Sequence, residues 1–332
     1  MPALAISLGD PAGIGPELIA EAWARREAEH LPPFFVVGGA GILAAAAASR
    51  GIDLPIARIG DPAEAAEAFA SALPVLGDDD DAWNPGAPDR AGAELALGSL
   101  TKAVKFAVSG AASGIVTGPI AKSRLADVGF TQPGQTEFVA EACGVNAEDA
   151  VMMLAGPSLR TVPLTVHVPL ASVPKLITTG LIIRKARIVA ASLNHLCAIF
   201  APRIAIAALN PHAGEDGLMG AEDVAIIAPA IALLQAEGIA ATGPHPADAL
   251  FAPHNRPTFD VAICMYHDQA LIPIKALDFD LGVNVTLGLP IIRTSPDHGT
   301  AFPIAGKYLA NPGAMIAAIR MAGDLAARRA QI

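Results

Sequence analysis

Short apolar runs alternate with alanine-rich stretches of helical length along most of this 332-residue chain, and each run ends in a loop rich in Gly, Pro, Asn or His. The runs include residues 3–8, 33–37, 114–116, 161–166, 203–208, 261–265 and 283–286. The helical stretches include residues 16–29, 95–109, 183–200 and 222–237. Strands that alternate with helices in this way are typical of an α/β protein with a mainly parallel sheet.

Composition narrows the class further. A chain of 332 residues exceeds what one hydrophobic core usually serves, so we expect two lobes. With 53% hydrophobic and 16% charged residues, a disordered chain is excluded, and the surplus apolar surface suggests a partner subunit. The net charge of −10 argues against a nucleic-acid binder, which would normally carry a basic surface to meet phosphates.

The chain has no pattern typical of membrane proteins. Its longest apolar region, about residues 188–209, is interrupted by Asn194, His195, Pro202 and Arg203, whereas a bilayer span needs about 20 nearly uninterrupted apolar residues. No targeting segment is expected either. The three cysteines are too few and too scattered for a disulfide framework, which favours a reducing, cytoplasmic compartment.

Three of the eight histidines stand just after apolar runs, each at the carboxyl end of an expected strand. They are His167, His212 and His267. If the strands are parallel, all three imidazoles emerge at one edge of the sheet, where ligands of α/β proteins bind. Three neutral imidazoles around an open position suit a catalytic divalent metal, zinc foremost. The alternative that the residues leave open is three unrelated loop or core histidines.

Two cations stand out because charged residues are scarce. Lys275 and Arg293 each follow a run of apolar residues, and Asn284 lies between them. An isolated buried charge is costly, so each cation needs an anionic partner. Arg can bind a carboxylate or phosphate through two hydrogen bonds, and Lys acts as a point charge. Both an internal salt bridge and an anionic small-molecule substrate fit this pattern.

Two glycine-rich turns could also hold anions. Residues 9–17 (GDPAGIGPE) join the first apolar run to the first helical stretch, with Pro16 suited to a first helical turn. They do not match the G-x-G-x-x-G spacing of dinucleotide-binding proteins. Residues 117–122 form a similar turn that offers a Thr and a Lys. These turns alone are also compatible with a purely structural role.

Taken together, the motifs resemble the 4-hydroxythreonine-4-phosphate dehydrogenases of pyridoxal 5′-phosphate biosynthesis, over nearly the whole chain. They are residues 9–17, 117–120 (TGPI), 209–215 (LNPHAGE), 266–269 (YHDQ), 283–290 (VNVTLGLP) and 293–302 (RTSPDHGTAF). The resemblance implies an isocitrate/isopropylmalate-dehydrogenase-like α/β/α fold with an active-site cleft between two lobes. We expect residues 1–130 and 290–332 to form the lobe with the cofactor loop. Residues 131–289 would form the metal, substrate and dimerisation lobe.

The resemblance also implies roles for individual residues. The metal, zinc foremost with magnesium or cobalt as alternatives, would be held by His167, His212 and His267, the third from the partner subunit of a homodimer. The implied substrate-binding residues are Gln135, Thr136, Lys275, Asn284 and Arg293. NAD or NADP would be held by His298, Gly299 and Thr300. The candidate catalytic residues, for proton handling or for orienting ligands and substrate, are Asp248, Asp268 and Lys275.

The chain departs from the family pattern at two positions. Gln135 stands where the family usually has His, and it can still donate to a phosphate oxygen but cannot carry a proton. Pro303 stands where the family usually has Asp, which removes a carboxylate and a backbone donor near the expected cofactor loop.

The implied reaction is NAD(P)-dependent oxidation of 4-phosphooxy-L-threonine at C3, then decarboxylation to 3-amino-2-oxopropyl phosphate. One alternative is a related dehydrogenase acting on threonate or erythronate 4-phosphate or on a cyclic diol, and Gln135 keeps it open. Another is a phosphate acyltransferase of the same fold, although acyl transfer gives no reason for three histidines at strand ends.

Overall fold

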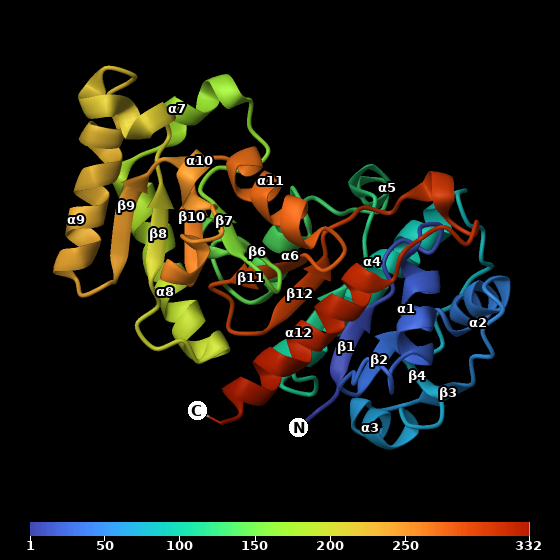
Figure 1. Ribbon diagram of the computed structural model, residues 1–332. Helices are drawn as coiled ribbons and strands as arrows, with labels where there is room; N and C mark the ends of the chain where they lie inside the picture. Colours follow the sequence, from blue (N-terminus) through green and yellow to red (C-terminus); the bar gives the residue numbers. More distant parts are fainter. Residues whose placement is uncertain (332) are drawn as a thin grey trace. The chain divides into compact units, whose positions relative to one another are not determined.

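The computed structural model describes residues 1–331, which form two compact units. Unit 1 comprises Met1–Ala147 and Leu289–Gln331, and unit 2 comprises Glu148–Gly288 (Figure 1). The first predicted lobe boundary, at residue 130, differs from this division. Residues 131–147 group with unit 1 because helix α6 (Gln135–Ala142) packs on α4 (Arg90–Ser109) and Gln135 bonds to Arg293.

Unit 1 is built on six parallel strands in the order β3-β4-β2-β1-β5-β12. Their bounds are β1 (Leu4–Ser7), β2 (Phe34–Val37), β3 (Ile56–Ile59), β4 (Leu73–Leu76), β5 (Ile115–Thr117) and β12 (Arg293–Pro296). Strands β1, β2, β4, β5 and β12 are buried along their whole length. Burial on both faces explains why most of them are continuous apolar runs rather than alternating ones.

Helices cover both faces of the unit 1 sheet. Helix α4 packs against β1, β2 and β5, and α12 packs from the opposite face against β12, β5 and β1 (Figure 1). The helices of the unit are α1 (Gly15–Ala24), α2 (Ala40–Ser49), α3 (Ala65–Ala68), α4, α5 (Lys122–Ala126), α6 and α12 (Gly313–Arg329). Pro16 lies in the first turn of α1, as predicted. Helix α4 begins where Asp89 accepts a hydrogen bond from Gly92 N and ends at Gly110, whose φ is 79°.

Unit 2 has a mixed sheet in the order β11-β6-β7-β10-β8-β9. The strands are β6 (Val151–Ala155), β7 (Arg160–Pro163), β8 (Ile204–Ala207), β9 (Ala241–His245), β10 (Val261–Cys264) and β11 (Val283–Leu287). Strands β7, β10, β8 and β9 are mutually parallel, and β6 is antiparallel to both of its neighbours. The predicted α/β fold with a mainly parallel sheet is confirmed, and in unit 2 strand β6 alone runs against the direction of the other described strands.

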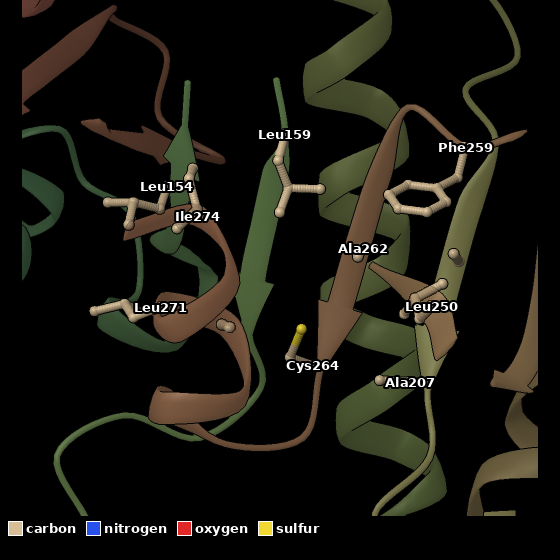
Figure 2. Close-up of a cluster of buried hydrophobic side chains, with 11 residues drawn as sticks. Leu154, Leu159, Ala207, Leu250, Phe259, Ala262, Cys264, Leu271 and Ile274 are labelled. Carbon is tan, nitrogen blue, oxygen red and sulfur yellow. The ribbon is translucent and has the colours of Figure 1, made fainter. Parts of the chain in front are cut away.

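The core of unit 2 lies between its sheet and helix α11 (His267–Asp278). Figure 2 shows Ile274 of α11 beside Leu154 of β6, in the cluster that also contains Leu271 of α11 and Cys264 of β10. Burial in this core raises the pKa of Cys264, so the thiol stays protonated and serves as a small apolar group. The other helices of the unit are α7 (Val173–Leu176), α8 (Thr179–Cys197), α9 (Ala228–Ala236) and α10 (Ala247–Leu250).

No helix within residues 1–331 is long and apolar enough to cross a membrane. The same part of the chain contains no disulfide, since all three cysteines remain as thiols.

Candidate active site

The three strands that precede the predicted metal ligands are neighbours in the unit 2 sheet. Strand β10 lies between β7 and β8, and all three are parallel and in register, with Ile263 opposite both Val162 and Ile206. Their carboxyl ends therefore meet at one edge, which the sequence predicted on the condition that the strands are parallel. His167 follows β7, His212 follows β8 and His267 opens α11 directly after β10. We refer to this as the histidine edge.

His167 and His267 lie beside each other in a pocket of about 220 Å³. Their ring centroids are 5.6 Å apart. The pocket is lined by Thr165, His167, Val168, Leu170, Val173, Tyr266, His267 and Asp268. Nδ1 of His267 is 2.8 Å from Oδ1 of Asp268. A carboxylate can only accept, so Nδ1 is the donor of this contact, and in the neutral tautomer that donates from Nδ1 the lone pair is on Nε2.

His212 reaches the same edge on an unusual turn. Residues 212–216 all have left-handed backbone angles, with φ of 52° at His212 and 56° at Asp216. L-residues adopt this conformation at a cost of about 1–2 kcal/mol each, so surrounding contacts must hold the turn. Within residues 1–331, no three His, Cys, Asp or Glu side chains are close enough to hold a metal ion. One copy of the chain therefore does not gather all three predicted ligands.

A buried carboxylate fixes the segment that leads into this turn. Asp223 is fully buried, and its Oδ1 accepts a hydrogen bond from Leu209 N at 2.8 Å. Its Oδ2 accepts from the backbone N of Asn210 at 3.1 Å and from Nδ2 of Asn210 at 2.9 Å. These charge-assisted hydrogen bonds orient the chain just before His212.

In unit 1, Arg293 is the centre of a polar cluster. It is only 3% exposed, and its Nη2 donates to Oγ1 of Thr117 at 2.8 Å and to Oε1 of Gln135 at 3.1 Å. Its Nη1 donates to Oγ1 of Thr136 at 3.5 Å. Burial lowers the pKa of Arg293 to about 10, and the nearby charge of Glu137 opposes that shift. The guanidinium is thus positively charged at neutral pH, and Thr117, Gln135 and Thr136 orient it.

The other predicted substrate and catalytic residues lie in unit 2. Lys275 is half-buried in the last turn of α11, and Asn284 is on β11. Oδ1 of Asn284 is buried without a hydrogen-bond partner among the described residues, as expected of an acceptor that awaits a ligand. Asp248 is exposed on α10, just after β9, at the histidine edge.

The predicted cofactor loop of unit 1 lies against the turn after β1. Ile14 N donates to the carbonyl of Thr300 at 3.0 Å, and a Cβ on Gly13 would lie 2.8 Å from that oxygen, so only glycine fits there. Nε2 of His298 is buried without a hydrogen-bond partner in residues 1–331. Such an orphaned polar atom suits a site whose ligand supplies the partner.

Both departures from the family pattern fit their surroundings. Gln135 donates from Nε2 to the carbonyl of Gly118 at 2.9 Å, while its Oε1 accepts from Arg293. Pro303 lies in the first turn of a short 3₁₀ helix (Phe302–Ile304), where a backbone N–H has no helical partner to lose.

Sequence reasoning did not single out several residues of these sites. Thr117 belongs to the glycine-rich turn already noted. Gln269, whose Nε2 donates to the carbonyl of Ala208 just after β8, belongs to the YHDQ motif, so position relative to a strand end could have found both. Asp223 carries no such signal, because it is one acidic residue in a stretch of helical pattern.

Comparison with known proteins relates the whole chain to one family. The family model described as "Pyridoxal phosphate biosynthetic protein PdxA" matches residues 30–322. A 4-hydroxythreonine-4-phosphate dehydrogenase from Erythrobacter litoralis is 63% identical over 327 residues, covering 98% of this chain and 97% of the relative.

Solved structures agree. A 4-hydroxythreonine-4-phosphate dehydrogenase from Klebsiella pneumoniae matches with a TM-score of 0.88 at 36% identity, covering 98% of both chains. A terephthalate 1,2-cis-dihydrodiol dehydrogenase from Burkholderia xenovorans matches with a TM-score of 0.65 at 30% identity, covering 97% of both chains.

Proposed function

Because this chain belongs to the PdxA family of pyridoxal phosphate biosynthetic proteins and is an oxidoreductase, we propose that it oxidises 4-hydroxythreonine 4-phosphate with a divalent metal and NAD or NADP. The observation that carries this proposal is the histidine edge, where three adjacent parallel strands deliver three imidazoles. Oxidation at C3 gives a ketone β to the carboxylate, which loses carbon dioxide to leave 3-amino-2-oxopropyl phosphate.

The donor set at the histidine edge fits a catalytic metal such as zinc, with magnesium or cobalt as alternatives. His167 and His267 would be two ligands, and Asp268 would hold His267 in the required tautomer. A metal bound there would act as a Lewis acid on the substrate hydroxyl and on the enolate formed by decarboxylation. Asp248, exposed at this edge, is our candidate for accepting the hydroxyl proton.

The phosphate would bind at the Arg293 cluster. Its guanidinium is charged and held in place by Thr117 and Gln135, so little ordering is needed when an anion arrives. Gln135 and Thr136 begin α6, whose first backbone N–H groups also favour an anion. Lys275 and Asn284 of unit 2 would contact the substrate as a cation and as an amide.

We assign the NAD(P)-binding role to His298, Gly299 and Thr300. The close packing of Thr300 on Gly13 and the buried Nε2 of His298 support a preformed nucleotide loop in unit 1. The nicotinamide ring would receive the hydride from C3 of the substrate.

A homodimer would complete the metal site. Exposed apolar side chains flank all three histidines, namely Val168 and Leu170, then Leu218, and Ile272 on the helix that starts at His267. Apolar surface of this kind is typical of a protein interface. A second copy docked there could supply the third imidazole, and the absence of a three-ligand group within residues 1–331 fits that arrangement. Cysteines that remain as thiols support a cytoplasmic location.

The test is a substrate comparison. Purified protein is given NAD⁺ or NADP⁺ with 4-phosphohydroxythreonine, erythronate 4-phosphate or a cyclic cis-dihydrodiol, and reduced cofactor is followed by absorbance with and without a chelator. We expect chelator-sensitive reduction with 4-phosphohydroxythreonine as the preferred substrate. Preference for erythronate 4-phosphate or the diol would reassign the substrate within the family. Activity that survives complete metal removal would refute the metal role.

A further inference from the structure

Two buried polar side chains connect the three strand ends of the histidine edge. The first is Thr165, just beyond β7, which is 7% exposed. Its Oγ1 donates to the carbonyl of Met265, just beyond β10, at 2.8 Å. Thr165 is two residues before His167 and Met265 two residues before His267, so this bond joins the backbones that carry the two imidazoles.

The second is Gln269, in the first turn of α11, which is 9% exposed. Its Oε1 accepts from Met265 N at 2.7 Å, and its Nε2 donates to the carbonyl of Ala208 at 2.8 Å. Ala208 follows β8 and stands four residues before His212. One amide side chain thus bridges the backbone that leads to His267 and the backbone that leads to His212.

Together these contacts form one continuous series across the sheet, from Thr165 through Met265 and Gln269 to Ala208. They follow the last residues of the strand ladders, just after the backbone hydrogen bond from Leu164 N to the carbonyl of Cys264, where the chains begin to separate into loops. A side chain whose donor and acceptor both bond to backbone sets the separation of neighbouring strands there within a few tenths of an ångström. An apolar side chain of equal size would fill the same space without fixing the separation of the strands.

We propose that Thr165 and Gln269 are positioning residues of the metal site, which hold the histidine-bearing loops of each copy in place, so that two copies together can present three imidazoles to a metal. This inference rests on the proposed function, because it concerns the geometry of the same site. Supporting groups of this kind commonly change metal affinity by about 10–100-fold when they are removed. A purely structural role would instead lower stability and leave the affinity of the folded protein unchanged.

The chain offers a matched control for each position. Thr161 is a fully buried threonine on β7 itself, and its Oγ1 has no hydrogen-bond partner among residues 1–331. Gln235 donates from Nε2 to the carbonyl of Ala241 at 2.8 Å, at the start of β9 and so at the opposite edge of the sheet. Thr161→Val and Gln235→Met therefore make the same substitutions away from the histidines. The first removes a buried hydroxyl that makes no hydrogen bond within the described chain, and the second removes an amide hydrogen bond at an exposed position.

The experiment measures binding of Zn²⁺ and Co²⁺ to the metal-free full chain by titration calorimetry, the visible spectrum of the Co²⁺ form, and the Tm of each metal-free variant. We expect Thr165→Val and Gln269→Met to weaken Zn²⁺ binding about tenfold or more and to alter the Co²⁺ spectrum, which reports ligand geometry. Both control variants should bind within about twofold of wild type, whatever their Tm.

The outcomes separate this inference from the function on which it rests. If Thr165→Val and Gln269→Met both bind Zn²⁺ with the affinity of the wild type and give its Co²⁺ spectrum, the positioning role is overturned and the metal site stands. Failure of wild type to bind either metal would overturn the metal site and the positioning role together. If Gln269→Met does not fold, Thr165→Val decides the question, since it exchanges one hydroxyl for a methyl group and keeps the branched shape of the side chain.

Discussion

The guanidinium of Arg293, at the start of β12, donates a 2.8 Å hydrogen bond to Oγ1 of Thr117 at the end of the neighbouring strand β5. The two residues are 176 positions apart in the chain. This contact aims a buried charge at the first turn of α6, where Gln135 and Thr136 complete the cluster. This is the cluster at which we propose that the substrate phosphate binds.

Arg293→Lys tests this assignment. Lysine keeps the charge but cannot bond to Thr117 and Gln135 while also holding an anion, so we expect the KM for the phosphorylated substrate to rise about tenfold or more. Steady-state kinetics measure the effect, with the exposed Arg329→Lys as control. An unchanged KM in Arg293→Lys would argue against phosphate binding at this cluster.

His212→Ala tests the third metal ligand. Losing one of three imidazoles should reduce metal content and activity at least tenfold, although His212 lies apart from His167 and His267 within one copy of the chain. Metal analysis of the purified protein gives the readout. His254→Ala, at an exposed loop histidine, should retain both properties. Full metal content in His212→Ala would remove this residue from the site.

Ile272→Asp tests the proposed dimer. This side chain is 66% exposed on the helix that begins at His267, so a charge there should disrupt an apolar interface at the histidine edge. We expect the variant to sediment as a monomer and to bind metal more weakly, because the ligand from the second copy is lost. Phe200→Asp is the control, since Phe200 is also exposed but precedes β8, at the opposite edge. A dimer that persists in Ile272→Asp would place the interface elsewhere.

Asp223→Asn tests the support of the left-handed turn. An amide cannot accept from all the N–H groups that Asp223 now serves, and the lost charge-assisted hydrogen bonds should lower the free energy of unfolding by about 2 kcal/mol. Chemical denaturation measures the difference. Asp216→Asn, at an exposed position in the turn itself, should change stability little, because Asn tolerates left-handed angles. Equal stability of the two variants would contradict the role given to Asp223.

We expect the stability of unit 2 to depend on pH through Arg203 and Asp260, which precede β8 and β10 at the edge of the sheet opposite the histidine edge. Hydrogen bonds from Arg203 hold the pKa of Asp260 below its ordinary value. A carboxylate with a depressed pKa stabilises the fold above its unfolded pKa of about 3.9, and this stabilisation is lost as pH falls through the folded pKa. Arg203→Met should therefore have a lower free energy of unfolding than wild type at pH 7. The difference between the two free energies should shrink below about pH 4.

Denaturation curves at several pH values check this prediction. Arg90→Met, which removes an exposed pair with Glu94 on α4, is the control and should show little effect at any pH. A difference between wild type and Arg203→Met that stays constant down to pH 2 would show that the effect does not come from the charge of Asp260.

Residue patterns were enough to predict the strands that are continuous apolar runs. Strands β1, β2, β8 and β10 are such runs, and their burial on both faces requires that composition. Strand β12 (Arg-Thr-Ser-Pro) and strand β9 (Ala-Thr-Gly-Pro-His) do not look like strands, and β12 forms because β5 pairs with it while α12 covers it. Burial in the tertiary structure thus overrides the low intrinsic strand propensity of this segment.

The sequence by itself determined the α/β class, the position of His167, His212 and His267 after strands, and the family, because periodicity and motifs are local properties of the chain. Only the tertiary structure decided which residues hold these groups in place. Gln269 bridges the ends of β10 and β8, and Asp223 anchors the turn of His212, through contacts that depend on strand order and on the packing of α11. Hydrogen bonds between segments distant in sequence follow from folding in three dimensions, and no local pattern encodes them.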